Sequence, residues 1–135
     1  MNTLTDYLRQ IVEPTLDDFK RNPASVRHAF LACVATYHAI DRVSYPKNAG
    51  NLRKKWRGKS SDFFTVDIVA HNFKHVRISD QRAPNRVIAA WPAMLGSMGL
   101  NDTMLNDSGV DVGYLIGVLE RAINFLRTEI PTNES

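Results

Sequence analysis

The histidines are the side chains of this sequence best suited to acid–base or metal chemistry near neutral pH. Gly-rich phosphate loops, paired cysteines and a serine-nucleophile elbow are absent. His71 and His75 are four residues apart and Asp67 comes one turn earlier, so on a helix the three share one flank. Such a flank could bind a metal ion, hold a catalytic histidine, or form a polar edge that hydrogen-bonds an adjacent helix. The polar edge is favoured, because no glutamate follows His71 to make a metalloprotease motif.

A block of positive charge lies between Asp41 and Asp62, where the sequence has no acidic residue. Its cations are Arg42, Lys47, Arg53, Lys54, Lys55, Arg57 and Lys59. Clustered cations attract the phosphates of nucleic acids by releasing counterions. The predicted nucleic-acid-binding residues are the four on one short helical turn, Arg53, Lys54, Lys55 and Arg57. The alternative interpretation is a solvated connector whose charges keep the protein soluble.

Two further features of the sequence, an arginine–histidine pair and an alanine-rich helix, resemble those of known proteins. Arg21 and His28 have the spacing of the arginine–histidine signature of HEPN-domain ribonucleases, although Pro23 places Arg21 outside the helix that carries His28. The run from 28 to 41 resembles an alanine-rich helix of uncharacterised bacterial proteins of HEPN-like build, which ends in a histidine followed shortly by an acidic or aromatic residue.

Those bacterial proteins carry, further along, a segment written roughly Ala-Asn-x-x-Lys-His. Here Ala70, Lys74 and His75 match the segment, whereas His71 replaces its asparagine. The resemblance implies that Lys74 and His75 are site residues, with His38 facing them from the neighbouring helix. These three are the expected catalytic residues, and a lysine beside a histidine in a groove can bind a phosphate or carboxylate. The structural alternative is that His38 and His75 only bridge two helices by hydrogen bonds.

The resemblance also implies a fold and a function. The expected fold is mainly α, an antiparallel four- to five-helix bundle of HEPN-like build with a short β-like insertion before the C-terminal helix. The expected function is RNA binding, or metal-independent RNA cleavage of a toxin or phage-defence type, without a cofactor or a metal ligand. Two other classes stay open: a non-catalytic interaction module that dimerises or meets a cognate partner through an apolar helix face, and a metal-binding bundle that uses His71, His75 and His38.

Apolar periodicity predicts the helices directly. They are expected over 3–21, 23–45, 62–76 and 111–130. Pro14 predicts a kink or a junction of two helices near Glu13. Asn22 followed by Pro23 is typical of an N-cap and a first helical turn, and Ser60 or Ser61 is expected to cap the third helix.

The remaining segments are predicted from turn chemistry. Leu52–Arg57 should form a short basic helical turn that Gly58 ends, and a small hairpin is expected over 86–108. A length of 135 residues favours a single helical domain over 1–135. Its core is expected to contain Phe30, Val34, Tyr37, Val69, Phe73, Leu115, Leu119 and Leu126.

Composition suggests a cytoplasmic protein. The sequence has no apolar stretch of membrane-spanning length, and its N-terminus lacks the pattern of a signal peptide. Its single cysteine, Cys33, cannot form an internal disulfide and is expected to be a buried thiol. We therefore expect no membrane partner.

Overall fold

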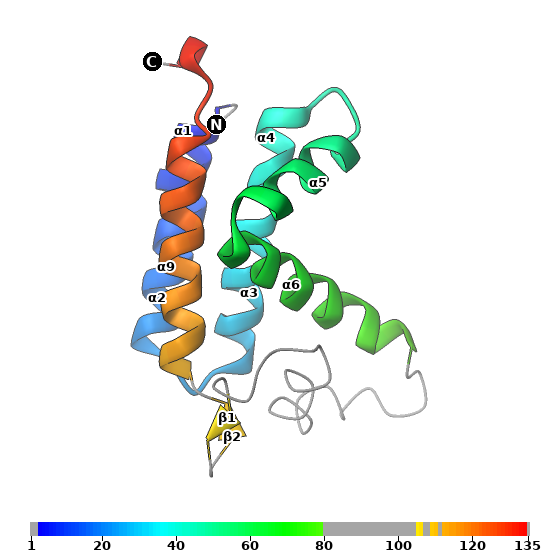
Figure 1. Ribbon diagram of the computed structural model, residues 1–135. Coiled ribbons are helices and arrows are strands. Elements are labelled where there is room, and N and C mark those ends of the chain that lie inside the picture. Colours follow the sequence, from blue (N-terminus) through cyan, green and yellow to red (C-terminus); the bar gives the residue numbers. More distant parts are fainter. Residues whose placement is uncertain (1–2, 80–104, 107–108, 111, 135) are drawn as a thin grey trace.

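The computed structural model describes residues 3–79, 105–106, 109–110 and 112–134, with side chains described over 3–71 and 113–134. The described chain is mainly helical, which confirms the mainly α part of the predicted fold (Figure 1). Its elements in chain order are α1 (Leu4–Tyr7), the π-helical η1 (Leu8–Val12), α2 (Glu13–Arg21), α3 (Val26–Tyr37), the 3-10 turn η2 (His38–Ile40), α4 (Asp41–Ser44), α5 (Gly50–Lys59), α6 (Ser61–Ser79), β1 (Leu105–Asn106), β2 (Gly109–Val110), α9 (Val112–Thr128) and the 3-10 turn η4 (Thr132–Glu134).

The first helical segment contains Pro14 without a break. A proline has no N–H to donate, and its ring clashes with the carbonyl one turn earlier in a regular α-helix. Here α1 leads into the wider turn η1, in which the Glu13 N–H reaches back to the Leu8 carbonyl. The proline then falls in the first turn of α2, where it is tolerated. The junction expected near Glu13 is therefore a change of helix type.

The start of α3 differs from the prediction. Ser25, not Asn22, is the N-cap, and its Oγ accepts a hydrogen bond from the His28 N–H at 3.2 Å. Asn22 instead closes α2, because its N–H donates to the Asp18 carbonyl at 3.1 Å. The predicted helix over 23–45 is thus shorter at its beginning, and it continues from α3 through η2 into α4.

The basic turn expected over 52–57 is a longer helix. Gly58 lies inside α5 and does not end it, since the helix continues to Lys59. The break comes at Ser60, which adopts an extended conformation (φ −137°, ψ 113°). The Ser60 Oγ then accepts from the Phe63 N–H at 3.0 Å, which confirms the predicted cap of the next helix. α5 and α6 are therefore joined by a single extended residue.

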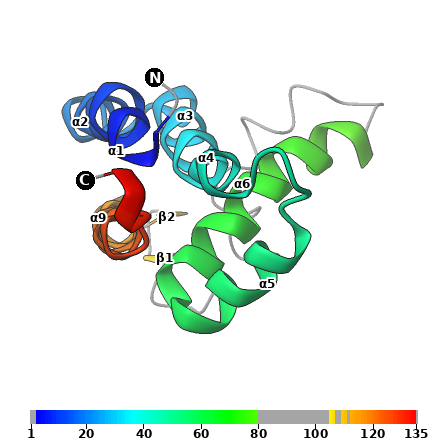
Figure 2. The same cartoon turned by 90° about the horizontal axis from the view of Figure 1, so that it is seen from above.

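The helices pack around α3. It contacts α2, α6 and α9, while α6 also packs against α9 and α5. α2 runs antiparallel to α3 and to α9, and α6 crosses them obliquely (Figure 1). Seen from above, α5 and α6 lie together on the side of α3 away from α2 (Figure 2). The largest fully buried side chains are Trp56, Phe19, Phe63, Leu4, Ile40, Leu115, Leu119, Leu126, Val12 and Val66.

The core expectation was partly wrong along α3. Val69, Leu115, Leu119 and Leu126 are buried as expected. Phe30, Val34 and Tyr37 are only partly buried and pack against the core from its margin. The fully buried positions of α3 are small ones, Ala29, Ala32, Cys33 and Thr36. Small side chains let the neighbouring helices approach closely, so the buried face is the one poor in large side chains. The side chain of Phe73 lies outside the described residues.

The two ends of the described chain are joined. The Glu134 carboxylate accepts from the N–H groups of Leu4, at 3.2 Å, and Thr5, at 3.0 Å. A carboxylate at a helix N-terminus satisfies free N–H groups and opposes the positive end of the helix dipole. The N- and C-terminal segments accordingly lie side by side (Figure 1).

The predicted β-like insertion is described only at its C-terminal end. β1 and β2 pair antiparallel, Leu105 opposite Val110 and Asn106 opposite Gly109. Residues 80–104 lie outside the described residues, so the hairpin expected over 86–108 stays a prediction. Within the described part of the chain, no helix is long and apolar enough to cross a membrane.

Candidate functional site

A buried carboxylate lies at the interface of α5 and α6. Asp67 of α6 is 1% exposed, in a core that is otherwise almost wholly apolar. Arg53 of α5 binds it with both sides of its guanidinium, Nε to Oδ2 at 2.9 Å and Nη2 to Oδ1 at 3.0 Å. This hydrogen bond raises the pKa of Arg53, so the guanidinium stays charged. A bidentate pair of this kind fixes the plane of the guanidinium as well as its position.

Arg57, one turn further along α5, approaches the same carboxylate. Its Nε lies 3.5 Å from Asp67 Oδ2, and this buried Nε has no hydrogen-bond partner among the described residues. The guanidinium also lies over the ring of Phe64, 4.2 Å from its centre. Arg57 is therefore held by an ion pair on one side and by an aromatic ring on the other.

His71 completes the group around Asp67. Its Nδ1 lies 2.7 Å from Asp67 Oδ1 and 2.9 Å from the Asp67 carbonyl oxygen. Both neighbours accept hydrogen bonds, so Nδ1 carries the proton. The ring of Tyr37 meets the imidazole edge-on, at 4.8 Å between centres. Burial, foremost, raises the pKa of the Tyr37 phenol, which therefore stays neutral at pH 7.

α5 is fixed in place by contacts on its inner side. Trp56 is buried and meets Phe63 edge-on at 5.3 Å and Phe125 at 5.8 Å. Lys59 forms an ion pair with Glu129 of the region after α9, at 2.8 Å. These contacts hold α5 against α6 and against the C-terminal end of α9.

An open hollow of about 560 Å³ lies on the outer side of α5. Its lining residues are Gly50, Arg53, Lys54, Arg57, Gly58 and Phe64. About a third of the Arg53 and Arg57 side chains is exposed, 35% and 34%. A Cβ added at Gly58 would meet no atom within 4 Å, so this glycine leaves the hollow open. Among the described residues, the lining of the hollow thus includes three cations and no carboxylate, and two of these cations contact the buried Asp67.

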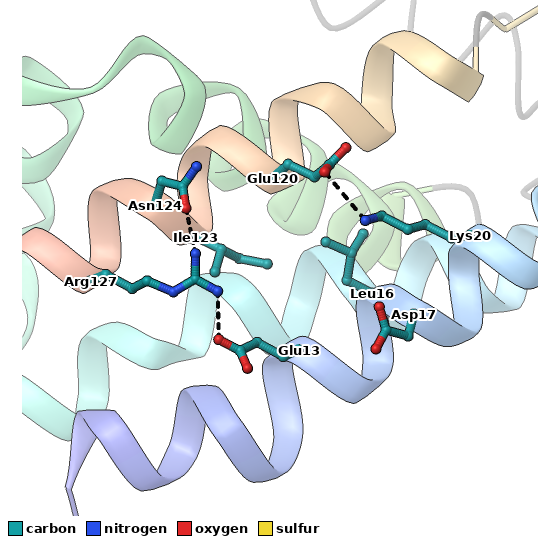
Figure 3. Close-up of a pocket in the computed structure, with 8 residues that line it drawn as sticks. All are labelled: Glu13, Leu16, Asp17, Lys20, Glu120, Ile123, Asn124 and Arg127. Carbon is teal, nitrogen blue, oxygen red and sulfur yellow. Dashed lines mark hydrogen bonds and ion pairs between the residues drawn. The ribbon is translucent and has the colours of Figure 1, made fainter.

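A second groove, of about 250 Å³, lies between α2 and α9 (Figure 3). Its charges are paired across the groove, Lys20 with Glu120 at 3.3 Å and Arg127 with Glu13 at 2.6 Å. Asp17 adds a further negative charge to its lining. This groove therefore offers an anion fewer uncompensated donors than the hollow on α5.

The four predicted nucleic-acid-binding residues divide into two groups in the structure. Lys54 and Lys55 are exposed and have no ion-pair partner within the described residues, whereas Arg53 and Arg57 contact Asp67. Outside α5, the Arg42 guanidinium lies over the ring of Tyr7, 4.8 Å from its centre. Of the four predicted nucleic-acid-binding residues, all but Lys55 line the hollow.

The predicted catalytic residues are only partly described. His38 is 54% exposed, and its Nδ1 lies 3.1 Å from Asp41 Oδ2, in the next turn of the same segment. Lys74 and His75 lie on α6, but their side chains are outside the described residues. Whether His38 faces them therefore stays a prediction.

The arginine–histidine pair near the start of α3 has local partners. Arg21 Nη2 binds Asp18 Oδ1 at 2.8 Å, and His28 Nδ1 lies 2.7 Å from the Ser25 Oγ. Each side chain thus takes part in a helix end, Arg21 in the last turn of α2 and His28 in the cap of α3.

A metal site was one alternative for the flank of α6. Over residues 3–71 and 113–134, no group of three histidine, cysteine, aspartate or glutamate side chains could hold a metal ion. His75, the third member of the predicted flank, has its side chain outside that range. Asp67 instead forms the polar edge, binding Arg53 of the adjacent helix.

Sequence reasoning missed the link between the two motifs. Asp67 was grouped with His71, and Arg53 with Arg57, but the two pairs were not joined. The i, i+4 spacing within each pair was a usable signal, because each spacing places its two side chains on one side of a helix.

Comparisons with protein-family models, curated proteins and solved structures gave no match for this chain.

Proposed function

We propose that this protein binds RNA through the hollow on the outer side of α5. The observation that carries the proposal is the arrangement of Arg53 and Arg57 over the buried Asp67, with Lys54 beside them. Phosphate oxygens are the ligands that suit such an arrangement, since guanidinium groups bind them with paired hydrogen bonds.

Arg53 keeps donors for a ligand after it has bound Asp67. Its Nε and one Nη2 hydrogen are used by the carboxylate, which leaves Nη1 and the second Nη2 hydrogen. Because Asp67 already fixes the guanidinium plane, a phosphate that binds there loses little of its binding energy to ordering the side chain. The buried carboxylate thus orients Arg53 before an external anion binds.

Net charge at the hollow favours an anion. Arg53, Lys54 and Arg57 line it, and Lys55 lies on the same helix. Asp67 offsets only one of these charges, and the nearest other acid in sequence, Asp62, forms an ion pair with Arg121 at 3.1 Å. Several cations on one helix can contact successive phosphates, as the extended backbone of a nucleic acid requires.

RNA cleavage and a HEPN-like bundle are the finer parts of this proposal. Cleavage rests on the motif match at Lys74 and His75, with His75 as general acid or base on the 2′-hydroxyl. The His75→Ala variant should abolish cleavage and leave RNA binding intact. Cleavage that persists in this variant would remove His75 from the proposal, while binding would stand.

RNA binding is tested by fluorescence anisotropy with a labelled RNA of mixed sequence, at about 50 mM and about 200 mM salt. For roughly three phosphate contacts, affinity should fall about 20-fold between the two salt concentrations. Lys54→Glu should weaken binding and flatten the salt dependence. No detectable binding at low salt by a folded protein would contradict the proposal and favour the interaction module.

The matched control is Arg27→Glu, which changes the net charge by the same amount. Arg27 is exposed, in the first turn of α3, at the opposite end of that helix from α4 and α5 (Figure 1). This variant should bind RNA like the parent protein. An equal loss in Arg27→Glu and Lys54→Glu would show that net charge, and not the hollow, governs binding.

A further inference from the structure

We infer that the hollow on α5 takes an unstacked base of single-stranded RNA, with the adjoining phosphate on Arg53 and Lys54. This inference rests on the proposed function, and it adds the class of RNA and the contact that selects it. The residue that separates it from a purely electrostatic site is Phe64.

Phe64 is a large apolar side chain at the surface. It is 37% exposed, although its neighbour Phe63 is fully buried. Its exposed part lines the hollow, beside the cations. Aromatic rings among cations are the usual platform for the bases of single-stranded nucleic acids, because every base has a flat face that can stack.

Arg57 extends this platform. Its guanidinium lies over the Phe64 ring, 4.2 Å from the centre, and Asp67 binds the same group. Arginine planes also stack on bases, and this guanidinium is already held by the ring and by its ion pair with Asp67. A base that enters the hollow can contact the Arg57 guanidinium and the exposed part of Phe64 together.

The size and lining of the hollow suit one splayed nucleotide. A volume of about 560 Å³ is within the range of sites that enclose small ligands. Gly58 lines it with open space around its Cβ position, so the helix backbone leaves room there for a flat ring. In a duplex the bases are stacked within the helix and cannot enter such a hollow, so a duplex could use only the cations.

The test is a competition experiment. A labelled single-stranded RNA is displaced by unlabelled single-stranded RNA, or by duplex RNA of the same length and composition. The single strand should compete at a concentration at least about fivefold lower, the gain expected from stacking one base. Phe64→Leu should reduce the preference for single-stranded over duplex RNA, whereas Phe64→Trp, which keeps an aromatic ring, should retain it.

Two further variants locate the effect. Gly58→Leu places a side chain in the hollow and should weaken single-strand binding while duplex binding changes less. Tyr45→Leu removes another exposed aromatic side chain, 82% exposed and outside the hollow, and should leave the preference unchanged. Circular dichroism confirms that each variant is folded.

The outcomes separate this inference from the proposed function. Equal competition by single strand and duplex, with no effect of Phe64→Leu, overturns the base site but leaves RNA binding in place. Loss of the preference in Tyr45→Leu, equal to that in Phe64→Leu, also overturns it. Failure of both RNAs to bind overturns the proposed function itself.

Discussion

The carboxylate of Asp67 on α6 binds the guanidinium of Arg53 on α5 through two hydrogen bonds, of 2.9 and 3.0 Å. The two residues are 14 positions apart in sequence, and they meet because the chain reverses at the extended residue Ser60. This contact both joins the two helices and sets the orientation of an arginine at the surface. The same contact therefore contributes to the stability of the fold and fixes the position of Arg53 in the lining of the hollow.

The first prediction concerns that contact. Asp67→Asn removes the charge that two arginines and a histidine share, so the free energy of unfolding should fall by about 1–3 kcal/mol. Asp18→Asn is the control, because Asp18 forms an exposed pair with Arg21 that is worth about 0–1 kcal/mol. Urea denaturation measures both. Equal losses in the two variants would show that the buried cluster contributes no more to the free energy of unfolding than an exposed ion pair does.

The second prediction concerns the aromatic core. Phe63 is fully buried between Trp56 and Phe125, so Phe63→Ala should cost about 3–5 kcal/mol. Phe30→Ala should cost clearly less, because Phe30 lies at the margin of the core. Thermal denaturation of the two variants gives the comparison. If Phe30→Ala melted at a lower temperature than Phe63→Ala, the marginal position of Phe30 in the core would be contradicted.

The third prediction concerns Gly58. It lies near the end of α5 with open space around its Cβ position, so Gly58→Ala should raise the free energy of unfolding by up to about 1 kcal/mol. Gly117→Ala in α9 is the comparison, because its new Cβ would come within 3.1 Å of Arg121 Nη1. Its gain should be smaller. A destabilised Gly58→Ala would mean that the hollow is not open at this position.

The fourth prediction concerns pH. Burial raises the pKa of the Cys33 thiol from 9.0 to about 12. Below pH 9 the thiol is protonated in both the folded and the unfolded chain. Between pH 9 and about 12 only the unfolded chain loses this proton, so stability falls as pH rises through that interval.

The measurement is urea denaturation at pH 8 and pH 10. Relative to Cys33→Ala, the parent protein should lose about 1.4 kcal/mol more between the two pH values. The variant keeps every other titrating group, so Tyr7 and Tyr37 affect both proteins alike. The same loss in parent and variant would contradict a buried, neutral Cys33.

Periodicity predicted the long helices but not where they end. α6 and α9 lie within a few residues of the expected ranges, since their apolar positions recur at helical spacing. The ends at Ser25 and Gly58 were wrong, because a serine cap competed with Asn22–Pro23 and a glycine was tolerated inside α5. These are small local energy differences, which tertiary contacts decide.

The core of α3 shows a limit of apolar patterns. Hydrophobicity favoured the face of Phe30 and Tyr37, but close packing placed Ala29 and Ala32 inside, beside Cys33, whose predicted burial is confirmed. Which face is buried depends on how near the neighbouring helices come, and that depends on side chains of other elements. The sequence of α3 alone does not contain this information.

The candidate site was predicted in part. The basic residues of α5 were identified from charge, and three of them line the hollow. The roles of Asp67 and Phe64 could not be deduced, because both depend on the way α6 folds back on α5 after Ser60. Charge patterns show which residues can bind an anion, whereas the reversal of the chain decides which of them meet.

The most direct measurement of the central claim is an NMR titration of the ¹⁵N-labelled protein with single-stranded RNA. RNA binding at the hollow predicts shifts of the backbone amides of Gly50, Lys54, Gly58 and Phe64. The amides of Leu16 and Ile123, in the groove between α2 and α9, should stay unchanged. Shifts confined to that groove, or no shifts at saturating RNA, would contradict an RNA site on α5.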